Sequence, residues 1–123
     1  TNLDFLEAKQ SILDRLFLLP EEFDAHKPLL RVCIKRLFED AASTFEGDKV
    51  FITTGDIDAM WLRDSSFQIK PLLRFSSIPS VADFILGVIR AQSFFINIDP
   101  VANAFNKEPN GMCWHRGTPL YQR

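Results

Sequence analysis

Apolar residues recur every three or four positions in several stretches of this chain, and that spacing places them on one face of an α-helix. The first stretch covers residues 3–18 and opens with Asp4 and Glu7 at the spacing of a capping box. The second runs from Pro28, a residue suited to a first helical turn, to Thr44. The pattern therefore predicts two helices in the N-terminal part of the chain.

Two more helices are predicted after a short β-branched stretch, residues 49–55, which is typical of a single strand. The third helix is expected to start at Ser65 or the next residue and to kink or stop at Pro71. The fourth is the clearest, with an apolar face over residues 81–96 and Ser80 at its expected cap.

Glycine in a helix interior costs about 1 kcal/mol relative to alanine, so Gly87 in the fourth helix indicates a close approach by another part of the chain. After residue 97 the periodicity is lost, and Pro100, Pro109 and Gly117 mark turns. The predicted fold class is all-α, with antiparallel helical hairpins, polar connecting loops and at most one short strand.

Composition narrows the possible functions. The 123 residues suit one domain, and the formal net charge of -2 lacks the basic excess that nucleic-acid binding requires. No apolar run reaches the roughly 18–20 residues of a membrane span, and the opening TNLDFLEAKQ lacks a signal-peptide pattern. We therefore expect a cytoplasmic protein without nucleic-acid or membrane partners. The chain begins with Thr1, so either an initiator methionine was removed or the reading frame starts upstream.

The cysteines and histidines do not have the spacing of a metal site. Cys33 and Cys113 are the two cysteines, and neither belongs to a CxxC pair. We expect two reduced thiols and no metal or other cofactor.

Residues 55–66, GDIDAMWLRDSS, combine charge with a large aromatic side chain. A solvated loop does not need Trp61, and a buried loop does not favour Asp56, Asp58 and Asp64 unless something satisfies them. A calcium loop of the EF-hand type is excluded, because the glycine required at its sixth position and the glutamate at its twelfth are missing.

Arg63 and Asp64, next to Trp61, fit the recognition of a sugar. A carboxylate accepts hydrogen bonds from neighbouring hydroxyls, a guanidinium donates to their oxygens, and an indole covers the apolar face of the ring. The competing interpretation is a structural Arg–Asp pair beside a core tryptophan, with Asp64 capping the third helix.

Asn103, Asn106 and His115 are weaker candidates. Amide side chains suit hydroxyl groups as donors and acceptors, but asparagine also occurs routinely in turns. His115 follows an aromatic residue, and a single histidine is more often a packing residue than a catalyst.

Three motifs in order, TGDIDAMWLRDSSFQIKPLL, IDPVANAFN and EPNG followed by WH, resemble the N-terminal third of glycoside hydrolase family 125. The resemblance covers roughly residues 28–115. Members of that family are metal-independent, exo-acting α-mannosidases that prefer α-1,6 linkages, and their fold is an α/α toroid of six helical hairpins.

The resemblance implies a partial toroid that binds a mannose-containing oligosaccharide. The implied ligands of the non-reducing mannose are Trp61, Arg63 and Asp64, with Asn103, Asn106 and His115 as weaker members and Asp56 as a loop-orienting or sugar-binding residue. Both catalytic carboxylates of the family lie further downstream, so none is expected in this chain. Inversion requires them to be roughly 6.5–9.5 Å apart.

The resemblance also implies a domain division, with residues 1–27 as a helical extension and 28–123 as the N-terminal part of a catalytic domain. By that division we expect the chain to be inactive alone and its apolar helix faces to lack some of their neighbours. The competing hypothesis is a non-catalytic carbohydrate-binding or structural helical domain.

Overall fold

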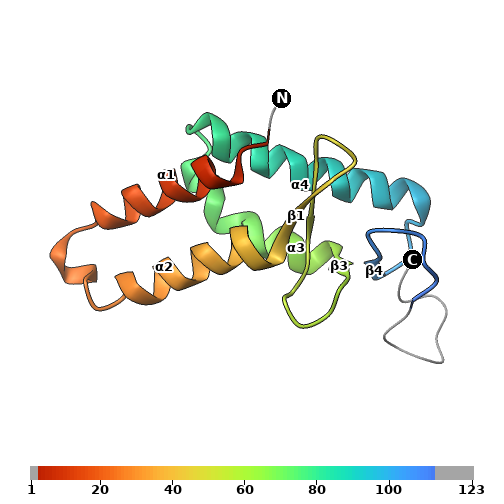
Figure 1. Cartoon of the computed structure of the whole chain (residues 1–123), viewed down its shortest axis with the longest axis horizontal. Helices are drawn as coiled ribbons and strands as arrows, with labels where there is room; N and C mark the ends of the chain where they lie inside the picture. The colour runs from red at the N-terminus through yellow and green to blue at the C-terminus, as the bar shows by residue number, and fades with distance from the viewer. Residues whose placement is uncertain (1–2, 113–123) are drawn as a thin grey trace.

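Four α-helices and two small antiparallel sheets make up the computed structural model, which describes residues 3–112 (Figure 1). The α-helices are α1 (Phe5–Phe17), α2 (Lys27–Arg36), α3 (Leu62–Ile69) and α4 (Pro79–Ile98). The short helical turns are η1 (Glu21–Phe23), the π-helical η2 (Leu37–Ala41) and η3 (Lys70–Phe75). The strands are β1 (Ala42–Phe45), β2 (Lys49–Ile52), β3 (Met60–Trp61) and β4 (Ala104–Phe105).

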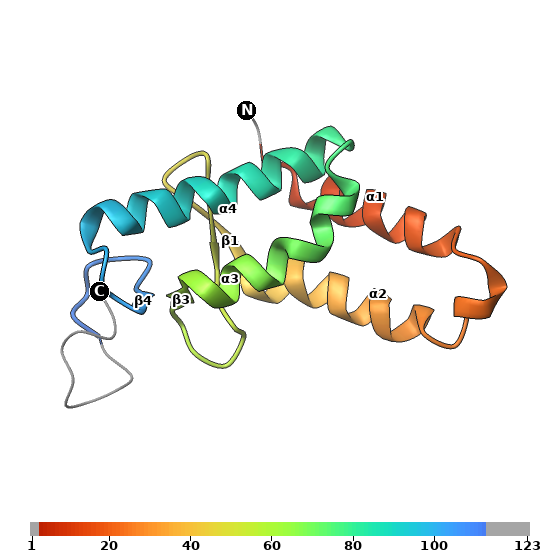
Figure 2. The same cartoon turned by 180° about the vertical axis from the view of Figure 1, so that it is seen from behind.

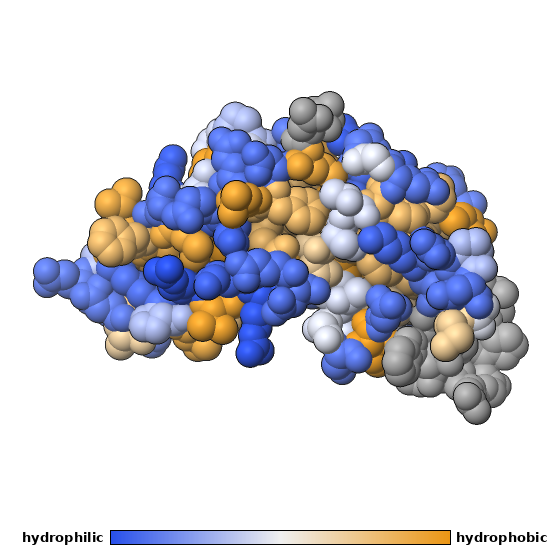
Figure 3. Space-filling model, viewed as in Figure 1, coloured by the Kyte–Doolittle hydropathy of each residue, from blue (hydrophilic) through white to orange (hydrophobic). Residues whose placement is uncertain are grey.

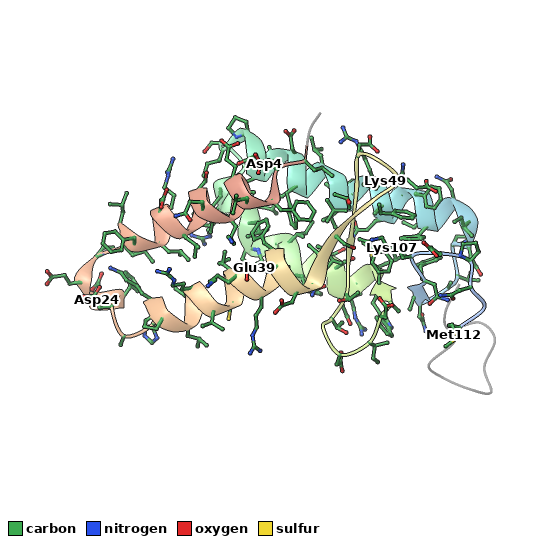
Figure 4. All side chains as sticks on the ribbon, viewed as in Figure 1. Asp4, Asp24, Glu39, Lys49, Lys107 and Met112 are labelled. Carbon is green, nitrogen blue, oxygen red and sulfur yellow. The ribbon has the colours of Figure 1, made fainter. Side chains whose placement is uncertain are left out.

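Helices α1 and α2 form an antiparallel hairpin that extends to one side of the molecule (Figures 1 and 2). Asp4 caps α1 as predicted, because its Oδ1 accepts the backbone N–H of Glu7 at 2.9 Å. At the far end, where Figure 4 labels Asp24, Lys27 Nζ lies 2.7 Å from the Asp24 carboxylate and donates to the Leu19 carbonyl at 2.8 Å. The buried Ala8 on α1 is part of the main core.

The second predicted helix ends earlier than expected. It turns into the π-helical segment η2, and residues 42–45 then pair with β2 as the strand β1, with Ala42 opposite Ile52. Glu46 and Gly47 both have positive φ, 43° and 80°, so the predicted helix-stop glycine is a hairpin-turn residue. The expectation of at most one short strand was therefore wrong, because the described residues contain four strands.

Helix α4 is the centre of the core. Its buried face packs against β2 and α1, and its Phe95 ring stacks on Phe45 at 5.3 Å and on Phe105 at 4.8 Å between ring centroids. By its length and its mean hydropathy of 1.4, α4 also qualifies as a candidate membrane span. The sequence did not suggest this, because polar residues interrupt the apolar positions of the helix. Its packing in this core accounts for that composition equally well.

Two predicted helix starts lie elsewhere. Helix α3 begins at Leu62, three residues before Ser65, and α4 begins at Pro79 with Ile78 as its N-cap. Neither start has a side-chain cap, and Ser80 is buried instead of capping. The expected interruption at Pro71 is confirmed, because α3 changes there to the 3₁₀ turn η3.

Several apolar side chains on the helices face outward. None of the residues of α2 is buried, and the outer side of α4 exposes Leu86, Ile89 and Ile96. Figure 3 shows apolar surface between polar side chains over the α1–α2 hairpin. Most of the predicted apolar face over residues 81–96 is nevertheless buried, including Val81, Phe84 and Val88.

Replacing Gly87 with alanine should destabilise the fold. The added Cβ would lie 2.6 Å from Val50 Cγ2 and 3.2 Å from the Asp48 carbonyl oxygen, and Val50 is fully buried and stiff at χ1. Overpacking costs about 1–3 kcal/mol, against a gain in helix propensity of about 1 kcal/mol. Thermal or urea unfolding should show that the free energy of unfolding falls by about 1 kcal/mol.

Ser93→Ala, on the exposed side of α4, is the matched control. Equal stability of Gly87→Ala and wild type would contradict the close packing.

Candidate functional site

The loop between β2 and β3 is anchored at its start. The Thr53 N–H donates to the Ala41 carbonyl at 3.0 Å, and Gln68 Nε2 on α3 donates to the Thr53 carbonyl at 2.9 Å. Gly55 has φ +105°, a conformation that side chains rarely adopt, so a glycine suits the turn that follows. These contacts fix the start of the loop against α3 and the last residue of η2.

Asp56 is exposed at the tip of this loop and is held as a carboxylate. The Thr54 hydroxyl donates to Asp56 Oδ1 at 2.7 Å, and this hydrogen bond is the main cause that lowers the pKa of Asp56 below its ordinary value. The backbone N–H of Asp56 lowers this pKa further. Desolvation opposes the shift, and the backbone N–H of Ile57 adds the smallest lowering effect. Asp56 is therefore suited to accept hydrogen bonds and unsuited to donate a proton near neutral pH.

A polar pocket of about 430 Å³ lies between this loop and the β1–β2 hairpin. Asp40, Asp56 and Asp58 line it together with Lys107, whose Nζ donates to Ser43 Oγ at 2.8 Å. Figure 4 labels Lys107 beside the hairpin. Sequence reasoning missed Asp40 and Lys107, because only the folded chain brings position 107 to position 43. A second, larger pocket separates α2 from the same loop, where the surface in Figure 3 is hollowed.

Arg63 and Asp64 lie side by side in the first turn of α3. Arg63 Nε is 3.5 Å from Asp64 Oδ1, and the two side chains are 83% and 37% exposed. The capping role considered for Asp64 is wrong, because the N-cap is Trp61 and no side chain caps the helix. An acidic group in a first turn interacts favourably with the helix dipole, and an ion pair this exposed contributes little to stability. Both side chains remain accessible to a ligand.

The side of α3 on which Asp64 lies faces the β2–β3 loop. Residues four apart share one face of a helix, and Gln68, one turn after Asp64, donates to the loop at Thr53. Arg63 lies one turn before the exposed Phe67, on a different side. Asp64 therefore belongs to the face of α3 that contacts the loop that carries Asp56.

The small sheet of β3 and β4 joins the two halves of the predicted site. Met60 pairs with Phe105 and Trp61 with Ala104, so the tryptophan lies opposite the residue that follows Asn103. Trp61 is half-buried and Asn103 is exposed. This pairing brings the WLRD and ANAFN motifs together although α3 and α4 separate them in sequence.

Asn106 has a structural role in addition to any ligand role. It is 8% exposed, and its Nδ2 donates to Asn110 Oδ1 at 3.0 Å and to the Met112 carbonyl at 2.8 Å. The turn interpretation of Asn106 therefore applies. His115 lies outside the described residues, as does Cys113, while Cys33 is a free, exposed thiol. Residues 3–112 contain no group of three His, Cys, Asp or Glu side chains that could hold a metal ion.

Comparison with known proteins shows to which family this chain belongs. The sequence profile of metal-independent α-mannosidases, GH125, matches residues 25–119, more than half of the chain. The chain belongs to family GH125. This membership and the helical architecture confirm the expected fold class, a part of an α/α toroid.

A solved GH125 structure resembles this chain closely. It is a metal-independent α-mannosidase of Streptococcus pneumoniae in a non-productive complex with α-1,6-mannobiose, with a TM-score of 0.74 and 29% sequence identity. The match covers 84% of this chain and 24% of that one. A curated relative, the meiotically up-regulated gene 157 protein of Schizosaccharomyces pombe, is 37% identical over 65 residues, or 52% of this chain. The chain covers only 13% of that relative's length.

Removal of the Thr54 hydroxyl should raise the pKa of Asp56 toward its ordinary value. In Thr54→Val the main hydrogen bond to the carboxylate is lost, so Asp56 should take up its proton at higher pH. Because its pKa is lowered in the folded state, the stability linked to Asp56 is present above the ordinary pKa and is lost as pH falls through the folded value. An NMR titration of the carboxyl carbon measures the change, with Thr44→Val as the control. An unchanged pKa would assign the shift to the backbone N–H groups.

Proposed function

We propose that this chain is part of an exo-acting α-mannosidase that releases terminal mannose from α-1,6-linked glycans with inversion. Its contribution is the subsite that binds the non-reducing sugar, formed by the β2–β3 loop, the first turn of α3 and β4. Membership of GH125 and the α-1,6-mannobiose in the related S. pneumoniae complex support the activity and the substrate class. The coverage of 24% and 13% of two relatives supports a contribution to a larger site.

The observation that carries the subsite assignment is the pairing of β3 with β4. It sets Trp61 opposite Ala104, the residue after Asn103, and Arg63 and Asp64 follow Trp61 in the first turn of α3. A hexose needs acceptors and donors for its hydroxyls and an apolar surface for its C–H groups. Carboxylate, guanidinium, amide and indole groups at one exposed place meet these needs together.

Arg63 and Asp64 form the centre of this subsite. Their ion pair is 3.5 Å long and exposed, so a sugar hydroxyl can accept from the guanidinium and donate to the carboxylate without separating a tight bond. A bidentate contact of this kind fixes both position and orientation of the ring.

The general acid and base are proposed to lie outside this chain. A general acid needs a carboxyl that keeps its proton near neutral pH, so its pKa is raised above the ordinary value. The pKa of Asp56 is shifted in the opposite direction by Thr54. Asp56 is therefore assigned to binding, in keeping with its exposed position on the loop.

Substitutions in the central pair should reduce activity more than stability. Asp64→Asn and Arg63→Lys, made in the complete protein, should each lower kcat/KM for an α-1,6-mannoside by about tenfold to a hundredfold. A charge-assisted hydrogen bond is worth about 1.5–3 kcal/mol, and each 1.36 kcal/mol corresponds to a factor of ten in rate. The matched controls are the exposed residues of other elements, Asp14→Asn in α1 and Arg74→Lys in η3. Lower melting temperatures with normal turnover would show that the pair is structural.

The stereochemistry of the product tests the proposed reaction. Inversion at an α-linked mannose releases β-mannose first, because water attacks the face opposite the leaving group. Proton NMR of an early reaction mixture should show the β-anomer before mutarotation. Initial α-mannose, or release of an internal oligosaccharide, would reject the proposal. Glycan binding without any hydrolysis would favour the carbohydrate-binding domain instead.

A further inference from the structure

One side chain of α4 holds the start of α3. Gln92 Nε2 lies 2.8 Å from Ser65 Oγ, 2.9 Å from Ser66 Oγ and 3.3 Å from the Leu62 carbonyl oxygen. An amide nitrogen carries two hydrogens, so the two short contacts to the hydroxyls are its main hydrogen bonds. Gln92 therefore connects two helices at the turn that carries Arg63 and Asp64.

The hydroxyls of Ser65 and Ser66 also form hydrogen bonds to the backbone of α3. Ser65 Oγ donates to the Leu62 carbonyl at 3.0 Å, and Ser66 Oγ donates to the same oxygen at 2.8 Å. Each hydroxyl accepts from Gln92 and donates to Leu62, so the hydrogen bonds form closed rings of aligned dipoles. Leu62 and Ser65 are fixed by this network, and Arg63 and Asp64 are the two residues between them.

Gln92 is itself held firmly. Its neighbours on α4, Val88, Ala91 and Phe95, are 0%, 0% and 2% exposed, and Ser65 on the opposite helix is fully buried. The start of α3 has no side-chain cap of its own, so its first turn lacks the usual support of a helix end. Gln92 supplies that support from the core.

We propose that Gln92 is a positioning residue for terminal-sugar recognition, acting through Ser65 and Ser66 on the backbone of Arg63 and Asp64. This inference rests on the proposed function of that pair. Gln92 does not touch the sugar. It sets the angle and the depth at which the guanidinium and the carboxylate are presented, where a small displacement weakens several hydrogen bonds at once.

The test uses Gln92→Met in the complete protein, because methionine keeps the length and approximate volume of the side chain and removes both N–H donors. Hydrogen exchange of the backbone amides in residues 66–69, which donate within α3, should become at least several-fold faster. KM for an α-1,6-mannoside should rise about tenfold with a smaller change in kcat, because misplaced binding groups weaken ground state and transition state alike. Ser93→Ala, the neighbouring exposed position on α4, should change neither quantity.

Ser66→Ala is a second variant that leaves the core untouched, because Ser66 is exposed. It removes one of the two rings and should shift exchange and KM in the same direction by a smaller factor. Unchanged exchange in both variants would overturn the connection between the helices. Faster exchange with an unchanged KM, in a protein whose Asp64→Asn variant loses activity, would overturn the positioning role.

The same experiment separates this inference from the proposed function. If Asp64→Asn and Arg63→Lys keep full activity, the subsite assignment fails, and the role of Gln92 in recognition fails with it whatever the exchange shows. If those two variants lose activity while Gln92→Met keeps its KM, the proposed function stands and only the inference is rejected.

Discussion

The close contact between α4 and β2 at Gly87 is the constraint on which the rest of the structure depends. A helix can approach a strand this closely only where its residue has no side chain, and Val50 occupies the space that a Cβ would take. The contact fixes the β1–β2 hairpin across α4. The same hairpin begins the loop of Asp56, and the same helix carries Gln92 and Phe95. The Asp56 loop and the first turn of α3 are therefore both positioned by elements that meet at the Gly87–Val50 contact.

Phenylalanine rings connect this part of the core to the strands next to the candidate subsite. Phe95 stacks on Phe45 of β1 and on Phe105 of β4, so one ring joins both small sheets. Phe105 is fully buried and pairs with Met60, the residue before Trp61. Polar groups on a loop are placed accurately only when rigid elements support them. Here the support is an aromatic cluster, which explains why a chain with so many phenylalanines presents its polar residues at a defined place.

Sequence reasoning predicted what depends on local spacing. The four helices, the Asp4 cap, the break at Pro71 and the close packing at Gly87 all follow from patterns within one turn or one stripe. The strand β1 was missed, because the stretch before Gly47 continued a helical stripe and its pairing with β2 is a tertiary choice. In the subsite, the WLRD motif stood out by composition. Lys107, Asp40 and Gln92 did not, because their roles exist only after distant segments meet.

The pairing of β3 with β4 also affects the order in which the parts of the structure form during folding. Its two strands are separated along the chain by all of α3 and α4, so their contact is among the non-local ones that form slowly and pay the larger loop-closure entropy. During synthesis the WLRD segment emerges well before its partner strand. The residues of the candidate subsite are therefore brought together only once the core helix α4 is in place.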